Sequence, residues 1–309
     1  MISKFRIGVL VIILNFFASV AMIWGQDNPS LLQMAVPSLN IAPDARGGGM
    51  GDMGAATLPD INSQYWNAAK YAFMGSKAGV SLSYTPWLRK LVNDVALVNM
   101  TGYYKLGNSD LQAISASLRY FSLGEVNIWE NIGDVPYGLN PYEMAFDVAY
   151  SRKLSESYSM AVTLRYIRSD MGTDQNDESN AGNAFSADIS GYLEKYVLMG
   201  NAEALWSFGF NLSNIGSKIS YDGGNTNQYL PAKLTLGTGL LYPIDDYNQI
   251  GVYLDLNKYM VPYAPQKEEG ETDADYQTRV DDYKSWSSLS GMLKSFTDSP
   301  NGLLKEIMV

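Results

Sequence analysis

Most of the chain beyond residue 78 alternates apolar and polar side chains with a period of two, and no other feature limits the fold so strongly. Tyr158, Met160 and Val162 fall on one face of such a segment, and Ser159 and Ala161 fall on the other. Successive side chains of an extended chain point to opposite faces, so the pattern predicts strands with two different faces. We predict nine strands, at 78–87, 94–105, 110–121, 143–151, 158–169, 184–196, 203–213, 232–242 and 248–258.

The connections between these strands alternate between short and long. Strands of about ten residues joined in this rhythm are typical of outer-membrane β-barrels, which have short periplasmic turns and long external loops. A closed barrel also pairs every backbone group inside a membrane. We therefore predict an all-β fold, a transmembrane antiparallel β-barrel. Short connections lie at 106–109, 152–157, 197–202 and 243–247, and long ones lie at 122–142, 170–183, 214–231 and from 259 onward.

Aromatic residues near the short connections support a position in a membrane, where they would form a girdle at one interface. A secreted β-sandwich is the alternative, because its strands alternate too. A sandwich would normally place Lys and Glu on its outer face, whereas small polar residues share one face here and apolar residues share the other. The aromatic residues are Tyr104, Tyr150, Tyr158, Tyr196, Trp206, Tyr242 and Tyr247.

The first 25 residues have the pattern of an export signal. Lys4 and Arg6 precede an apolar run over 7–23, and Gly25 precedes a plausible cleavage point. The alternative, a transmembrane helix, needs about 20 apolar residues, slightly more than this run provides. We expect a signal peptide at 1–25 and an outer-membrane location. Because bacterial barrels usually have an even number of strands, we also expect that C-terminal strands are missing and that the chain is truncated at Val309.

The composition argues against several functions. The chain has 309 residues, a formal net charge of -10, no cysteine and no histidine. It therefore lacks thiolate sites and Ser-His-Asp catalysis, and its acidic balance argues against nucleic acid as a partner. We predict no catalytic residues, no cofactor and no metal site. The alternative, a weak calcium hypothesis, rests on Asp174, Asp177 and Glu178.

Residues 26–77 do not alternate and carry two motifs. Residues 42–51 read Ala-Pro-Asp-Ala-Arg-Gly-Gly-Gly-Met-Gly, and residues 60–73 read Asp-Ile-Asn-Ser-Gln-Tyr-Trp-Asn-Ala-Ala-Lys-Tyr-Ala-Phe. The glycine run lacks the Gly-Lys-Ser/Thr ending of a phosphate loop, so we expect close packing or positive φ at these glycines. The two motifs resemble the PorV family of type IX secretion proteins, within the FadL-like barrels, and the resemblance extends to residue 293.

The resemblance implies a FadL-like barrel of about fourteen strands at 78–309, with 26–77 as a hatch-like segment. It implies a non-enzymatic protein that binds cargo C-terminal signal domains at the type IX translocon barrel. The protein would carry them to an attachment complex with a PorU-like sortase, among outer-membrane lipid and lipopolysaccharide. The alternatives are a FadL-like channel for hydrophobic small molecules and a lipid A deacylase. The signature residues of the hatch are Asp44, Arg46, Gly49, Met50, Asn62, Trp66 and Asn67.

FadL-like proteins have Asn-Pro-Ala where this chain has residues 67–69, Asn-Ala-Ala, so FadL ligand chemistry is not carried over. Several charged residues lie on the predicted inward faces, where a structural network is the usual role and transport or catalysis the alternative. Asp44 and Arg46 could pair with that network, which is a hypothesis. The inward-facing charged residues are Asp147, Asp188, Asp255, Arg119, Arg165 and Lys233.

The segment after the last predicted strand is acidic as far as Asp282 and then has apolar residues at helical spacing. A solvated loop with a helix packed on the barrel rim is one interpretation. An external docking element for cargo or translocon is the other, because apolar anchors flanked by charge suit an interface. The candidate docking residues are Tyr259, Met260, Tyr263, Trp286, Leu289, Leu293 and Phe296.

Overall fold

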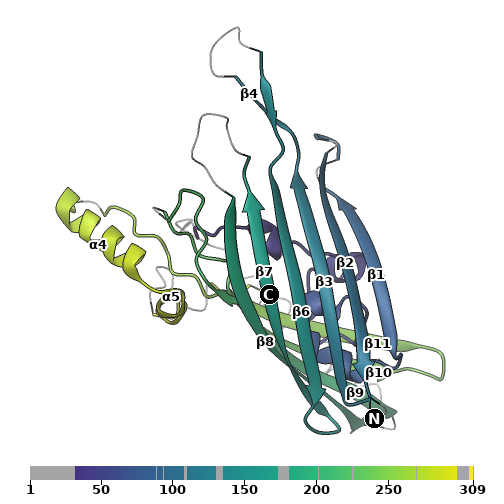
Figure 1. The fold of residues 1–309 in the computed structure, drawn as a ribbon. Coiled ribbons are helices and arrows are strands. Elements are labelled where there is room, and N and C mark those ends of the chain that lie inside the picture. Colours follow the sequence, from purple (N-terminus) through teal and green to yellow (C-terminus); the bar gives the residue numbers. More distant parts are fainter. Residues whose placement is uncertain are drawn as a thin grey trace.

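Strands dominate the computed structural model (Figure 1). It describes residues 32–87, 89–92, 94–107, 110–129, 135–172, 181–200, 202–224, 226–268, 270–297 and 306–308. Nine strands form one antiparallel sheet in chain order, which confirms the predicted all-β fold; their ends differ from the predicted ones by three residues or fewer. The strands are β1 (Ala78–Pro86), β2 (Val95–Leu106), β3 (Gln112–Leu123), β6 (Tyr142–Lys153), β7 (Tyr158–Asp170), β8 (Gly182–Met199), β9 (Ala202–Gly216), β10 (Lys233–Pro243) and β11 (Gln249–Tyr259).

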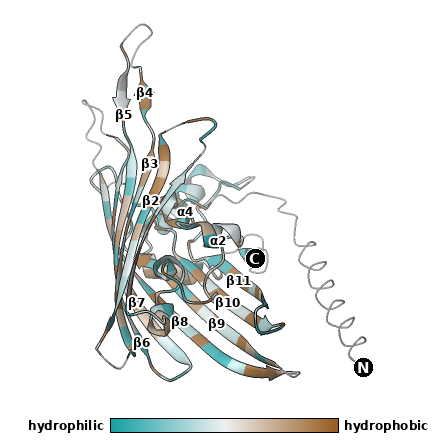
Figure 2. Ribbon diagram, turned by 90° about the vertical axis from the view of Figure 1, so that its right-hand side faces the viewer, coloured by the Kyte–Doolittle hydropathy of each residue, from teal (hydrophilic) through white to brown (hydrophobic). Residues whose placement is uncertain are grey.

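The sheet curves around a hollow but does not close among the described residues (Figures 1 and 2). Strand β1 forms one edge and β11 forms the other. The chain returns to the edge of β11 at Met308, whose N–H and C=O pair with Asn257 at 2.9 and 2.8 Å. The fold is therefore barrel-like, with two edges that do not meet in the described part of the chain.

The two faces of the sheet differ as the alternation predicts. On β7, Ser159, Thr163 and Arg165 are buried, whereas Val162 and Leu164 are 51% and 65% exposed. Polar residues thus face the hollow and apolar residues face outward, an arrangement typical of a barrel surrounded by lipid. Among the residues that the structure describes, no helix is long and apolar enough to span a membrane. Exposed aromatic residues near the short connections include Tyr104, Tyr150, Tyr196, Trp206 and Tyr247.

Two elements differ from the sequence-based expectation. The predicted loop at 122–142 contains a hairpin of β4 (Val126–Ile128) and β5 (Tyr137–Leu139), which projects beyond the rim of the sheet (Figure 1). Strands of three residues are too short to show alternation. The acidic stretch expected as a loop contains α4 (Asp273–Ser285), whose N-cap Thr272 accepts a hydrogen bond from the Asp275 N–H. Acidic residues in its first turn also stabilise the helix, because they lie at the positive end of its dipole.

Residues 32–77, which we call the hatch segment, lie in the hollow of the sheet (Figure 2). The helical turn η2 packs against β3, β6, β7 and β8. Its Tyr71 is fully buried and stacks on Tyr103 of β2, with 5.0 Å between ring centroids. The predicted signal peptide at 1–25 lies outside the described residues. The short helices of the hatch segment are η1 (Pro37–Asn40), α2 (Ala45–Gly49), α3 (Ser63–Trp66) and η2 (Ala68–Phe73).

Candidate functional site

The two sequence motifs of the hatch segment pack together around Trp66. A Cβ atom on Gly47 would lie 2.2 Å from Trp66 Cζ2, and one on Gly54 would lie 2.3 Å from Trp66 Cγ. The indole Nε1 donates a 2.8 Å hydrogen bond to Asp44 Oδ2, while Asp44 Oδ1 accepts from the Gly47 N–H at 2.8 Å. These contacts confirm that glycine is needed here for close packing.

The other signature residues have separate roles. Asn67 Nδ2 donates to the carbonyl oxygens of Ala55 and Gly191, both at 2.9 Å, and so ties the hatch segment to β8. Asn62 is half-buried before α3, Met50 follows α2, and the exposed Gly49 has no atom within 4 Å of where a Cβ would stand. Of the seven signature residues, Asp44, Trp66 and Asn67 therefore make the most specific contacts.

The hypothesis that Asp44 and Arg46 join the charged network of the sheet is wrong. Arg46 forms an ion pair with Asp60 and a 3.3 Å hydrogen bond to the carbonyl oxygen of Leu58, all inside the hatch segment. Asp44 is occupied by Trp66 and the N-terminus of α2. Both side chains are satisfied locally, so neither is left to bond a strand.

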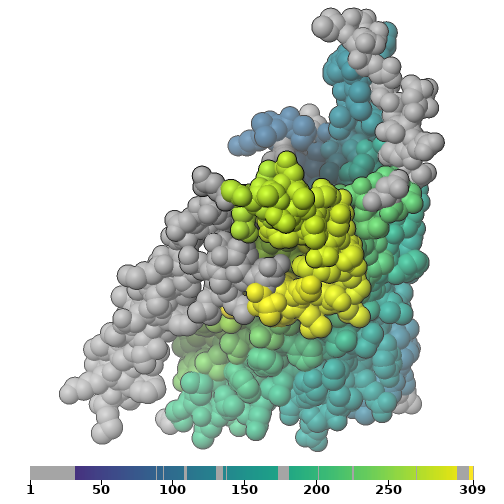
Figure 3. Space-filling model, turned by 90° about the vertical axis from the view of Figure 1, so that its left-hand side faces the viewer, coloured from purple at the N-terminus to yellow at the C-terminus, as the bar shows by residue number. Residues whose placement is uncertain are grey.

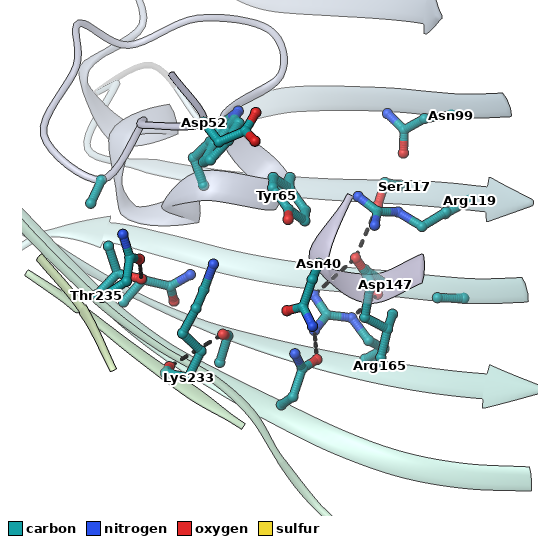
Figure 4. Close-up of a pocket in the computed structure, with 18 of the residues that line it drawn as sticks. Asn40, Asp52, Tyr65, Asn99, Ser117, Arg119, Asp147, Arg165, Lys233 and Thr235 are labelled. Carbon is teal, nitrogen blue, oxygen red and sulfur yellow. Dashed lines mark hydrogen bonds and ion pairs between the residues drawn. The ribbon is translucent and has the colours of Figure 1, made fainter. Parts of the chain in front are cut away.

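The charged network of the sheet centres on Arg165 (Figure 4). Its Nε lies 2.6 Å from Asp147 Oδ1 on β6, and its Nη2 lies 2.8 Å from Asp188 Oδ2 on β8. Asn214 on β9 also accepts from the guanidinium, and Ser117 on β3 donates to Asp147 Oδ2 at 3.0 Å. All five residues are buried. The network thus joins five neighbouring strands through paired charges, which is a structural arrangement.

Other inward-facing charges hold the backbone of the hatch segment. Arg119 Nη1 donates to the Ser38 carbonyl oxygen at 2.8 Å, and its guanidinium carbon lies 4.5 Å from the centroid of the Tyr65 ring. Glu143 Oε2 accepts from the Ser38 N–H at 3.0 Å. Glu143 was not singled out from the sequence, although it is the first residue of the predicted strand 143–151 and shares the inward face with Asp147, so the alternation could have indicated it.

A second anchor lies at β9–β11. Asp255 Oδ2 accepts from the N–H groups of Gly54 and Ala55 at 2.8 and 2.9 Å. A Cβ atom on Gly209 would lie 1.9 Å from the carbonyl oxygen of Ala55, so only glycine lets the hatch backbone approach β9 this closely. A Cβ on Gly237 would lie 2.3 Å from Asp255 Oδ1. The strands are thus shaped to receive residues 54–55.

Lys70 is a buried cation that the sequence did not single out. Its Nζ donates to the Gly54 carbonyl oxygen at 2.8 Å and to Thr57 Oγ1 at 3.1 Å, and the side chain has no exposure. Burial lowers the pKa of Lys70 to about 8, while the negative charges of Asp60 and Asp255 oppose this shift. The hatch segment therefore contains an amine whose protonation state changes near neutral pH.

At the centre of the hollow, the space left between the hatch segment and the strands is small and polar. A cavity of about 30 Å³ lies between Asp52 and Tyr65 of the hatch segment and Arg119, Lys233 and Asp255 of the sheet (Figure 4). That volume accommodates about two water molecules, whereas small-molecule sites have about 300 Å³ or more. The hatch segment therefore fills this part of the hollow.

The predicted docking residues do not form one surface. The helix expected from Trp286 to Phe296 is present as the shorter α5 (Ser288–Lys294), which starts after Trp286 because Ser287 caps it. Leu289 and Leu293 are 63% and 71% exposed. The helices lie on the outside of the molecule (Figure 3). Of the remaining docking residues, Met260 is buried, Phe296 packs beside it, and Tyr259, Tyr263 and Trp286 are half-buried.

Metal ligands are scarce in the described part of the chain. No group of three or more acidic residues that could hold a metal ion occurs among the described residues. The three residues of the calcium hypothesis, Asp174, Asp177 and Glu178, lie outside them.

The fold and the site define a class of protein: an all-β chain with an outwardly apolar, curved antiparallel sheet whose hollow holds an N-terminal segment. Residues 25–267 match the family model described as type IX secretion system protein PorV. This match covers well over half of the chain, so the protein belongs to the PorV family and is a component of the type IX secretion system. It confirms the resemblance carried by the two motifs. A comparison with curated proteins gave no match.

Proposed function

We propose that the protein is a non-enzymatic, outer-membrane component of type IX secretion that binds cargo C-terminal signal domains at the translocon barrel. It then carries them to the attachment complex with a PorU-like sortase. The match to the PorV family over residues 25–267 is the observation that carries this proposal. The exposed apolar face of the sheet supports the membrane location, to which a cleaved signal peptide at 1–25 would direct the chain.

The packing of the hatch segment favours the shuttle over a channel for hydrophobic molecules. Asp255, Asn67 and Arg119 bond the hatch segment to the sheet from different sides. A channel would have to break these buried bonds, each of which costs about 1–3 kcal/mol when a polar group is left unpaired. The small cavity beside them also leaves no room for a transported molecule at the polar centre of the hollow.

The chemistry of the inward face favours a non-enzymatic role. The central charges are paired with one another around Arg165, and Asp255 is bonded to the hatch backbone. The one of them that contacts a serine, Asp147 with Ser117, is already paired with Arg165. The chain has no histidine to activate a serine. Lipid A incubated with the purified protein should therefore keep its acyl chains, and mass spectrometry of the lipid measures this directly.

We propose α5 as the docking element for cargo or translocon. Leu289 and Leu293 are exposed on it, while Met292 anchors the helix on outward-facing Leu212 and Leu234. The ammonium group of Lys294 lies 3.5 Å from the centroid of the Trp286 ring. Exposed apolar side chains held on an anchored helix suit a protein partner.

The experiment is purification of the full-length gene product from outer membrane in mild detergent, without crosslinker, followed by mass spectrometry of the proteins that accompany it. We expect the translocon barrel, a sortase or cargo with C-terminal signal domains. Lipid or fatty acid without any protein partner would overturn the shuttle and favour the channel. The variant Leu289→Asp/Leu293→Asp should lose partners, whereas Leu154→Asp, at an equally exposed leucine in a short connection, should keep them.

A further inference from the structure

The outer face of the sheet carries an apolar groove far from the hatch segment. Its floor is formed by Gly102 of β2 and Ala116 of β3, which are register partners. The groove has a volume of about 500 Å³. Its walls include the outward-facing Val80, Met100, Tyr104, Leu118, Phe146 and Val148.

Small residues at one level of the sheet create this groove. Val80, Gly102, Ala116 and Val148 share one register row across β1, β2, β3 and β6. The row on one side contains Met100, Leu118 and Phe146, and the row on the other contains Tyr104, Ile114 and Tyr150. Glycine and alanine are poor strand residues, so this depression is made at some cost in strand propensity.

One end of the groove carries two cations. Lys77 precedes β1 at the level of Tyr104, with its Nζ 5.8 Å from the centroid of that ring. Arg152 is exposed on β6, two residues beyond Tyr150. Neither cation forms an ion pair with a described residue. The ammonium group of Lys77 donates a hydrogen bond to the neutral carbonyl group of Gly107, which leaves its charge without a counter-ion. In a chain of net charge -10, two cations without an anionic partner among the described residues, beside an apolar groove, are complementary to an anion with an apolar tail.

The dimensions agree with a lipid. The segment of β2 from Met100 to Leu106, which lies at the level of Arg152, spans about 20 Å at the rise of an extended strand. One leaflet contributes about 15 Å to the hydrocarbon core of a bilayer. The cations lie at the end of the sheet that carries the short connections, which face the periplasm in barrels of this kind.

We propose that this groove binds one acyl chain of an anionic glycerophospholipid from the periplasmic leaflet, with the phosphate held by Lys77 and Arg152. Tyr104 and Tyr150 border the site at the level where the acyl chain meets the head group. Tyr150 is held by the 2.7 Å hydrogen bond that its hydroxyl donates to Gln112 Oε1. The proposal rests on the membrane location of the protein and not on its role in cargo transport.

The test measures lipid retained by the purified full chain in native mass spectrometry after addition of phosphatidylglycerol or phosphatidylcholine. Gly102→Leu/Ala116→Leu fills the groove, and a Cβ on Gly102 would meet no atom closer than 3.5 Å, so the variant should fold. The added side chains would deprive about two methylene groups of the acyl chain of their contact with the groove. We therefore expect about tenfold weaker retention of phosphatidylglycerol. The control Ala187→Leu, on the outward face of β8 opposite Leu164, should bind as the unmodified protein does.

The head-group contact is tested with Lys77→Gln/Arg152→Gln. We expect this variant to lose the preference for phosphatidylglycerol over phosphatidylcholine, while Lys195→Gln, at the same end of the sheet on β8, keeps it. Equal retention by the groove-filling variant and its control would overturn the proposal, as would equal retention of both lipids by the unmodified protein. A membrane protein that co-purifies with the unmodified chain and is lost from Gly102→Leu/Ala116→Leu, with lipid retention unchanged, would assign the groove to a protein partner instead.

Discussion

Trp66 fits so tightly between two glycines that a single methyl group added to either would overlap the indole ring. Contacts of this kind, made by individual atoms of Asp44, Asn67 and Asp255, fix the position of the hatch segment. The sequence motifs predicted that these glycines serve close packing. They did not predict which ring would pack there, because that depends on how residues 47 and 54 come together in space.

The first prediction concerns this packing. Gly47→Ala should destabilise the protein by about 1–3 kcal/mol, because the new methyl group forces the indole ring to move, even though alanine favours a helix. Urea unfolding in detergent measures the change. Gly49→Ala, two residues further in α2 with no atom near its Cβ position, is the matched control and should be neutral or slightly stabilising.

The second prediction concerns Lys70. Its pKa falls from 10.5 in the unfolded chain to about 8 in the fold, so between these values the unfolded chain binds the extra proton. The free energy of unfolding should therefore rise with pH, by on the order of 2 kcal/mol from about pH 8 to about pH 10. Lys70→Met lacks this contribution. If the unmodified protein and Lys70→Met changed in parallel over this range, the buried charge would not be linked to stability.

The third prediction concerns Arg165. Arg165→Met leaves Asp147 and Asp188 buried without their cation, which should cost about 3–5 kcal/mol. Arg168→Met on the same strand removes a partly exposed side chain that donates a 3.1 Å hydrogen bond to the Tyr142 hydroxyl and lies 3.8 Å from Asp170, and it should cost about 1 kcal/mol. Unfolding midpoints of the two variants, compared with the unmodified protein, give the difference. Similar losses in both would show that burial does not determine the contribution of these arginines.

At the scale of secondary structure, the nine long strands and the apolar helix α5 were predictable, whereas β4, β5 and α4 were not. Each of the nine long strands has enough residues to show alternation, whereas β4 and β5 have three residues each. The apolar spacing from Trp286 to Phe296 suggested one helix, but the hydroxyl of Ser287 accepts from the Ser290 N–H and starts a new helix after Trp286. The cap thus determines where the predicted helix begins, two residues after the start of the apolar pattern.

The fourth prediction follows from that cap. Ser287→Ala should destabilise α5 by about 1 kcal/mol, which corresponds to roughly fivefold faster amide exchange in residues 288–294 without a change in the sheet. Hydrogen exchange with mass spectrometry measures both regions. Ser288→Ala, whose side chain makes no hydrogen bond to a described residue, controls for the loss of a hydroxyl. Unchanged exchange in Ser287→Ala would mean that packing of Met292 alone holds the helix.

At the scale of the whole molecule, the sheet and the hatch segment act as one body. Charged and polar side chains from β2 to β11 face a hollow that the hatch segment fills, with about 30 Å³ left open at its polar centre. The two-faced strands predicted the polar hollow. They did not show how closely the hatch segment fits its polar centre, because the fit depends on backbone approaches such as that of Ala55 to Gly209.

The fifth prediction concerns permeability. Liposomes that contain the purified full-length protein should exclude small sugars, because the hatch segment occupies the polar centre of the hollow. Asp255→Ala removes the acceptor for two hatch N–H groups and should increase swelling in sugar solutions, whereas Asp245→Ala, in a short connection, should not. Free passage through the unmodified protein, at a rate comparable to a porin, would contradict the filled hollow.

The bonds from Gly54 to Asp255 have a consequence for the order of folding. The two residues are 201 positions apart, so the hatch segment enters the periplasm well before its partner on β11 does. Contacts between such distant residues form late, because a long loop must first be closed. The segment that emerges first is therefore among the last to become ordered, and until then the growing sheet has an unfilled polar side.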